Sequence, residues 1–201
     1  MNANDIFISH MDAMRVHYES DSVHGYALPV DVSSFDLRSQ SAANDDEGRL
    51  QVTTDLQCYK EDANDFIGIQ EMAINDSVAA LEAIKMLDDD STGAFASAMN
   101  KQKEETKKKS DAIINKNFKK LIETGIRYPK QQKRILLAAQ KIGVFFADFL
   151  VSANVFFEEL GSSVVSFFKN VGEWFRNTDK AIINWTSAAI NSIVKFFSSL
   201  I

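Results

Sequence analysis

Three histidines, His10, His17 and His24, recur at intervals of seven near the start of the sequence. On one continuous helix they would share a face, an arrangement that suits a metal site or a pH sensor. Metal ligands on a helix are normally three or four residues apart, and a spacing of seven separates the Cβ atoms by about 10 Å. The spacing therefore favours coincidence, and we expect neither a metal nor another cofactor.

Cys58 is the single cysteine, so the chain has no intramolecular disulfide. A catalytic thiol needs a neighbouring base, and no obvious one adjoins Cys58 in the sequence, which favours a small apolar residue at this position. The chain also lacks a glycine-rich phosphate loop, an HExxH motif, a CxxC pair and a Gly-x-Ser-x-Gly motif. We therefore expect a protein that is not an enzyme.

The composition favours helices. Only 8 glycines and 2 prolines occur in 201 residues, whereas all-β folds spend more of both on turns, and an apolar fraction of 45% is typical of folded proteins. We predict an all-α (mainly α) fold, an elongated bundle of about five or six helices. The less regular N-terminal region holds the one candidate strand pair, in which 49–58, with its alternating Leu50, Val52 and Thr54, pairs with a segment around 26–32.

Charge divides the chain into three parts. Residues 1–100 hold 19 acids and 5 bases, residues 101–134 hold 12 bases and 4 acids, and residues 135–201 hold five of each. Together with the apolar pattern, this distribution predicts an acidic, loop-rich region at 1–64, a two-helix region with a basic tract at 65–128, and aromatic amphipathic helices at 129–201. A further short helix is expected at 3–18, capped near Asn4, and Pro129 is expected to begin a helix.

The aromatic region carries an eleven-residue repeat. Ten of the 15 phenylalanines lie between Phe145 and Phe197, and Phe-Phe doublets begin at Phe145, Phe156 and Phe167. Eleven residues make three turns at about 3.67 residues per turn, so the doublets share one face of a helix, and the charged side chains between them fall in a separate sector. Two readings stay open at Gly161: one long helix, or a hairpin in which residues 161–163 end one helix and begin the next.

A final helix is expected at 180–201, after a capping signal at 177–179. Its polar face is made of small uncharged residues, and 181–194 carries no charge. Such a face suits a helix that tolerates lipid or lines a wet path. The side chains predicted to bind a membrane or a partner are Phe145, Phe146, Phe149, Phe156, Phe157, Leu160, Phe167, Phe168, Val171, Trp174, Phe175, Trp185, Ile193, Phe196 and Phe197.

The basic tract is predicted to contact an anionic surface. The bases concerned are Lys107, Lys108, Lys109, Lys116, Lys119 and Lys120. Acids interrupt the tract, and the acidic N-terminal half would repel a duplex, so nucleic acid is not expected as a partner. The alternative is that the tract pairs internally with the acidic half.

The segment at the start has no basic stretch followed by a long apolar run, so no Sec-type signal is expected. We expect synthesis in the cytoplasm, export by a specialised secretion system and action at a target membrane. The favoured hypothesis is a soluble protein that converts to a membrane-associated or pore-forming state, as a secreted bacterial toxin or effector would. Its expected partners are a lipid bilayer or a helical protein, with a homo-oligomer and a cognate immunity protein or chaperone as further candidates.

The alternative hypothesis is a non-enzymatic helical interaction or assembly subunit whose C-terminal apolar stripe docks a partner protein. An aromatic stripe at helical spacing is also what an ordinary helical core requires.

Overall fold

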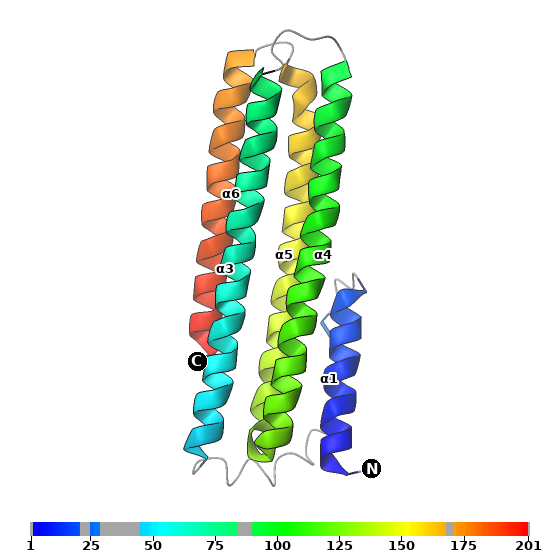
Figure 1. The fold of residues 1–201 in the computed structure, drawn as a ribbon, viewed down its shortest axis with the longest axis vertical. Helices are drawn as coiled ribbons and strands as arrows, with labels where there is room; N and C mark the ends of the chain where they lie inside the picture. The colour runs from blue at the N-terminus through cyan, green and yellow to red at the C-terminus, as the bar shows by residue number, and fades with distance from the viewer. Residues whose placement is uncertain (1, 21–24, 29–44, 84–89, 168–170, 201) are drawn as a thin grey trace. The chain divides into compact units, whose positions relative to one another are not determined.

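A computed structural model describes residues 2–20, 25–28, 45–83, 90–167 and 171–200, with side-chain detail for these ranges except 81–83, 90–92, 164–167 and 171–172. All regular secondary structure in these ranges is helical (Figure 1). Five α-helices follow one another: α1 (Ala3–Glu19), α3 (Asp46–Ala83), α4 (Asp90–Arg127), α5 (Gln132–Phe167) and α6 (Val171–Leu200). One 3-10 turn, η3 (Pro129–Gln131), precedes α5, as expected from Pro129. The all-α prediction is confirmed.

The short helix α1 begins with a capping box. The Asn2 side chain accepts a hydrogen bond from the Asp5 amide at 2.9 Å, and the Asp5 carboxylate accepts one from the Asn2 amide, also at 2.9 Å. These two bonds satisfy amide groups that the first turn of a helix leaves without partners. Phe7, Met11 and Met14 recur at helical spacing and are fully buried. The expected helix is therefore present, but its cap is Asn2, and Asn4, near which the cap was expected, lies inside the helix.

The predicted strand at 49–58 is wrong, because these residues lie inside α3. The buried side chains are Val52, Leu56 and Tyr59, which follow a helical period, whereas Leu50 is 68% exposed. The Thr54 hydroxyl donates to the Leu50 carbonyl one turn earlier, a bond that lets a β-branched residue sit in a helix. The segment around 26–32, which was expected to pair with this strand, has no regular structure at 25–28, and the remainder of the segment lies outside the described residues.

Neither reading of the repeat region 144–176 holds throughout, because α5 ends at Phe167 and residues 171–176 belong to α6. Helix α5 continues through Gly161, so 161–163 do not form a hairpin turn. The Ser162 hydroxyl instead donates to the Glu158 carbonyl at 2.7 Å, and the Ser163 hydroxyl to the Leu160 carbonyl at 2.8 Å. Residues 177–179 likewise lie within α6, so the predicted helix start at that point is wrong.

Contacts divide the chain into two compact units whose boundary falls inside the four long helices. Unit 1 comprises Met1–Asp62, Ser110–Asp148 and Phe196–Ile201, and unit 2 comprises Ala63–Lys109 and Phe149–Lys195. The core of unit 1 is built from α1 together with the unit 1 parts of the long helices, and its largest buried side chains include Phe7, Met11, Tyr59, Phe118, Phe146 and Phe197. The core of unit 2 is one cluster formed by Ile74, Val78, Phe95, Met99, Ala153, Phe157, Leu160, Trp174 and Ile182.

Candidate functional site

In unit 2, the aromatic side chains of α5 pack against those of α6. The Phe156 ring stacks on the Trp185 indole, with ring centroids 4.8 Å apart and planes 9° apart. Phe149 and Phe157 approach the same indole at 6.2 and 5.9 Å between ring centroids. Offset stacking of this kind adds about 0.5–1.5 kcal/mol beyond the area that the rings bury. Trp185 is therefore the centre of the α5–α6 contact in unit 2.

In unit 1, a second stacked pair joins the same two helices. The Phe145 and Phe196 rings are 4.5 Å apart between centroids, with planes 12° apart. Tyr59 of α3 packs beside them, 5.3 Å from Phe146 and 5.7 Å from Phe197 between ring centroids. The aromatic contact of α5 with α6 is thus present in each unit.

The two stacked pairs keep one antiparallel register. Eleven residues separate Phe145 from Phe156 on α5, and eleven separate Trp185 from Phe196 on α6. The eleven-residue repeat predicted for α5 therefore has a counterpart on α6, formed by Trp174, Trp185 and Phe196. That counterpart was overlooked in the sequence because it uses two tryptophans and one phenylalanine, without a repeated doublet.

Trp174 is anchored by contacts on two sides. Its ring lies 5.7 Å from the Phe95 ring of α4 between centroids, and its Nε1 donates to the Ser163 hydroxyl of α5 at 3.2 Å. The indole N–H, the one polar atom of a buried tryptophan, thereby has a partner. The same hydrogen bond gives α5 and α6 a directional contact near the ends of both helices.

The fifteen predicted apolar contact residues fall into three groups. Seven are buried: Phe146, Phe149, Phe157, Leu160, Trp174, Ile193 and Phe197. Five are half-buried: Phe145, Phe156, Phe175, Trp185 and Phe196. Phe168 and the side chains of Phe167 and Val171 lie outside what the structure describes. In this fold the described members pack against one another and against α3 and α4, so their use at another surface requires the helices to part.

Contacts between α3 and α4 include several buried polar side chains. In unit 2, the Gln70 carboxamide oxygen accepts hydrogen bonds from Gln102 at 3.0 Å and from the Thr106 hydroxyl at 2.8 Å. All three residues are buried. In unit 1, Asp62 accepts from Lys116 at 2.7 Å and from Asn117 at 3.3 Å. The α3–α4 contact thus differs in character from the aromatic α5–α6 contact.

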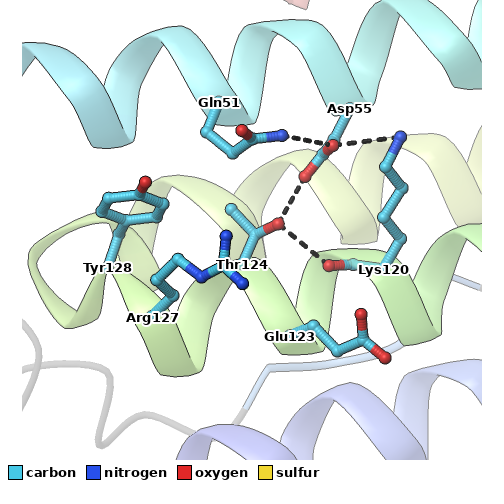
Figure 2. Close-up of a pocket in the computed structure, with 7 residues that line it drawn as sticks. All are labelled: Gln51, Asp55, Lys120, Glu123, Thr124, Arg127 and Tyr128. Carbon is cyan, nitrogen blue, oxygen red and sulfur yellow. Dashed lines mark hydrogen bonds and ion pairs between the residues drawn. The ribbon is translucent and has the colours of Figure 1, made fainter.

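A pocket of about 130 Å³ in unit 1 surrounds a buried carboxylate (Figure 2). Asp55 is 2% exposed and accepts from Gln51 at 3.0 Å, from Lys120 at 3.1 Å and from the Thr124 hydroxyl. Burial lowers the pKa of Lys120, but its contacts with Asp55 and Cys58 raise it more, so the net shift is upward. Three donors thus satisfy Asp55, and two of them, Lys120 and Thr124, come from α4, so Asp55 connects α3 to α4.

The basic tract is partly paired with acids, as the alternative interpretation expected. Lys116 pairs with Asp62, and Lys120 pairs with Asp55. Lys108 and Lys119 are exposed on α4, while Lys107 and Lys109 are half-buried. An anionic surface would therefore be contacted first through the exposed members of the tract.

The residues first considered for catalysis are not gathered into one site. His10 and His17 lie on α1, and the His17 ring contacts Tyr18 and Tyr26 at 5.0 and 5.6 Å between centroids. His24 is outside the described residues. Within the described part of the chain, no group of three His, Cys, Asp or Glu side chains is close enough to hold a metal ion.

No protein-family model, curated protein or solved structure matches this chain. Similarity to known proteins therefore gives no information on the function of this chain. Among the described residues, Pro129–Ser163 is the one helical stretch that is long and apolar enough to cross a membrane by length and composition, and half of its most apolar part is buried. The core helix of a soluble protein can meet the same criteria.

Proposed function

We propose that this protein is soluble in the fold described here and converts to a membrane-associated or pore-forming state in which α5 and α6 enter a lipid bilayer as a pair. The observation that carries the proposal is the shared eleven-residue register of the two helices. Phe145 stacks on Phe196 and Phe156 stacks on Trp185, so α5 and α6 contact each other directly in both units. Because α5 and α6 are held to each other in this way, they could separate from α3 and α4 as a pair.

The polar side chains between α3 and α4 support the proposal. When α5 and α6 depart, hydrogen bonds such as those of Gln70 with Gln102 and Thr106 can remain between α3 and α4, where access of water to them has little net effect on the free energy. Apolar faces of α5 exposed by the same step favour lipid, at roughly 1.5–3 kcal/mol for each fully buried phenylalanine. Opening would therefore expose the apolar faces of α5 and α6 to lipid, while the polar contacts between α3 and α4 would tolerate water; the apolar side chains of α3 and α4, such as Ile74 and Phe95, would have to pack against each other.

The apolar stretch of α5 has the length of a membrane-spanning segment. The most apolar stretch of α5 lies within Pro129–Ser163, which exceeds the ~20 residues that span a bilayer. On α6, residues 181–194 carry no charge and are flanked by Lys180 and Lys195. Lysines at such positions extend their ammonium groups to the interface, so α5 could cross the hydrocarbon layer, while α6, whose uncharged run is shorter than a span, could enter the layer without crossing it.

A role as a secreted toxin or effector at a target membrane is the biological setting that we propose for this conversion. Cytoplasmic synthesis and export by a specialised system belong to the same proposal. A cognate immunity protein or a chaperone would then be needed to protect the producing cell, and assembly of several copies would be needed if the membrane state is a pore.

The test is to lock α5 to α4 and measure membrane activity. Lys103 of α4 forms an ion pair with Glu158 of α5. In a Cys58→Ser background, Lys103→Cys and Glu158→Cys are joined with a short, thiol-cleavable bis-maleimide. We expect dye release from anionic vesicles to be abolished by the cross-link and restored by reduction, because α5 cannot enter the bilayer while it is attached to α4.

The matched control is Lys101→Cys with Glu105→Cys, a pair that lies within α4 alone. Its cross-link spans one turn of one helix and should leave dye release unchanged. Equal release from both cross-linked proteins would contradict the proposal, as would a complete absence of release from the protein before cross-linking.

The second candidate function is that of an assembly subunit that docks a partner protein. Phe146, Phe157 and Phe197 are buried in this fold, so docking through the stripe would also require the helices to part. In that case vesicles should show neither binding nor release, and the protein should remain folded and unchanged in their presence.

A further inference from the structure

Helix α1 is seated in unit 1 on two glycines. A Cβ atom added at Gly125 of α4 would lie 2.3 Å from the Phe7 ring, and one added at Gly143 of α5 would lie 1.9 Å from the Tyr18 ring. Both distances are far below van der Waals contact, so the rings occupy the space that any side chain would need. Phe7 is fully buried and Tyr18 is 3% exposed. The glycines therefore form a fitted seat for the two aromatic ends of the α1 core face.

Hydrogen bonds fix α1 and the chain after it to α5. The Tyr18 hydroxyl donates to the Gln140 carbonyl at 3.2 Å and accepts from the Tyr26 amide at 3.1 Å. The Gln140 side chain donates to the Tyr26 carbonyl at 2.7 Å. Near the other end of α1, the Gln132 side chain donates to the Asn4 side chain at 2.9 Å. These bonds connect both ends of α1 to one helix.

The part of α5 beneath these contacts belongs to the apolar stretch Pro129–Ser163. Gln132, Gln140 and Gly143 all lie within it, and Val144 is in van der Waals distance of a Cβ placed on Gly25. The cover is a short helix of 17 residues, whereas α3, α4 and α5 have 36 to 38. Loss of the α1 contacts would expose the first part of the stretch Pro129–Ser163. The contacts of the long helices with one another would remain.

We propose that α1 is a releasable cover over the first part of α5, seated by Phe7 on Gly125 and by Tyr18 on Gly143, and that its release precedes insertion of α5 and α6 into lipid. This inference rests on the membrane function proposed above. It adds an order of events: α1 leaves first, and α5 leaves α3 and α4 afterwards. Anything that loosens α1 should then accelerate membrane entry.

The test replaces the seat and leaves the helices intact. Gly125→Ala and Gly143→Ala add a methyl group where the rings lie, while alanine in a helix interior favours the helix over glycine. Gly68→Ala is the matched control, because Gly68 lies in α3 with nothing within 4 Å of an added Cβ. Release of α1 is read by hydrogen exchange of amides 3–19 and by tryptic cleavage after Arg15, the one Lys or Arg in residues 1–37.

We expect exchange in α1 to be about tenfold faster in Gly125→Ala/Gly143→Ala, with dye release from anionic vesicles faster by a similar factor, and Gly68→Ala to match the natural protein in both measurements. Unchanged exchange in α1 would show that the packing of Phe7 and Tyr18 on the two glycines does not hold α1 in place. Faster exchange with unchanged dye release would overturn the cover while leaving the membrane function intact. Faster exchange in a protein that never releases dye, before or after substitution, would overturn both the membrane function and the order of events, and only the seat would stand.

A covalent tether gives the converse measurement. Asn4→Cys and Gln132→Cys, joined by the cleavable bis-maleimide in the Cys58→Ser background, hold α1 against α5. Dye release should be suppressed until the tether is reduced. Full activity of the tethered protein would overturn the cover even if the α4–α5 cross-link abolishes release.

Discussion

The Phe156 ring lies nearly parallel to the Trp185 indole, 4.8 Å away between ring centroids. Eleven residues from each, Phe145 and Phe196 repeat the arrangement with an interplanar angle of 12°. A helix with an eleven-residue apolar repeat returns to nearly the same face after three turns, so two such helices running antiparallel bring their aromatic positions opposite each other repeatedly. The stacked pairs are the physical basis for treating α5 and α6 as one element.

A double-mutant cycle should detect the Phe156–Trp185 contact. Phe156→Leu and Trp185→Leu each remove one ring, and together they should be less damaging than the sum of the two separate losses by about 0.5–1.5 kcal/mol in the free energy of unfolding. Urea denaturation followed by circular dichroism measures all four proteins. Strict additivity would mean that the two rings are only neighbours.

Removal of Lys120 should weaken the contact of α3 with α4 at Asp55. In Lys120→Met the buried carboxylate keeps Gln51 and Thr124 as donors but loses its positive partner. We expect a loss of about 1–3 kcal/mol in the free energy of unfolding, less than for a fully buried pair because the lysine side chain is 38% exposed. Lys119→Met, at an exposed neighbouring position, should change stability by less than about 0.5 kcal/mol. Equal effects from the two variants would show that the Lys120–Asp55 ion pair does not stabilise the contact between α3 and α4.

Tyr59→Phe should stabilise unit 1. The Tyr59 ring is fully buried beside Phe146 and Phe197, and its hydroxyl has no hydrogen-bond partner among the residues that the structure describes. An unsatisfied buried hydroxyl costs about 1–3 kcal/mol, so its removal should raise the free energy of unfolding by roughly 1 kcal/mol. Tyr128→Phe serves as the control, because its hydroxyl donates to Glu47 at 2.8 Å and its loss should not stabilise. A destabilised Tyr59→Phe would show that the hydroxyl is satisfied.

The same residue predicts a dependence on alkaline pH. Burial, together with the charge of Asp62, raises the pKa of Tyr59 well above its usual value of 10.0. The folded protein therefore keeps a proton that the unfolded chain loses, so this contribution to stability is complete below pH 10 and decreases by about 1.4 kcal/mol for each pH unit above it. Urea unfolding between pH 9 and 11 should show a shallower loss for Tyr59→Phe. Parallel curves for the two proteins would contradict the assignment.

Much of this fold could be predicted from sequence because helical periodicity is a local property. The cap near the start of α1, the role of Pro129 and the aromatic face of α5 all depend on residues within a few turns of one another. The strand prediction failed because three alternating apolar or β-branched residues also fit a helix when Thr54 bonds back to Leu50. Only the longer series that includes Leu56 and Tyr59 distinguishes the two periods.

The contacts between helices could not be predicted in the same way. Gly125 and Gly143 carry no sequence signal for the rings that rest on them, because those rings come from α1, more than a hundred residues away. Likewise, the repeat on α5 does not reveal that its partner is α6 in an antiparallel register. Sequence periodicity identifies a face, whereas packing decides what covers it.

Binding to anionic vesicles should weaken with salt through the part of the basic tract around Lys108, which is exposed on α4. Lys107, Lys108 and Lys109 changed to Glu should reduce vesicle partitioning measurably, since each base near such a surface contributes about 1 kcal/mol. Lys116→Glu and Lys120→Glu are unsuitable as controls, because both residues pair with acids of α3. Arg49→Glu, at an exposed position of α3, is the comparison. Flotation at increasing salt measures the effect, and salt-independent binding would assign the tract to internal pairing.

The central claim is that α6 enters the hydrocarbon layer together with α5, and the two tryptophans test it most directly. Trp174 and Trp185 are the only tryptophans in the chain, and both lie in α6. Their fluorescence is to be measured in vesicles whose lipids carry bromine at a shallow or a deep position of the acyl chain. Trp174→Phe and Trp185→Phe separate the two signals. The account predicts strong quenching of Trp185 by deep bromines, lost when α5 is cross-linked to α4. Vesicle-bound protein whose Trp185 is quenched by neither lipid would contradict it.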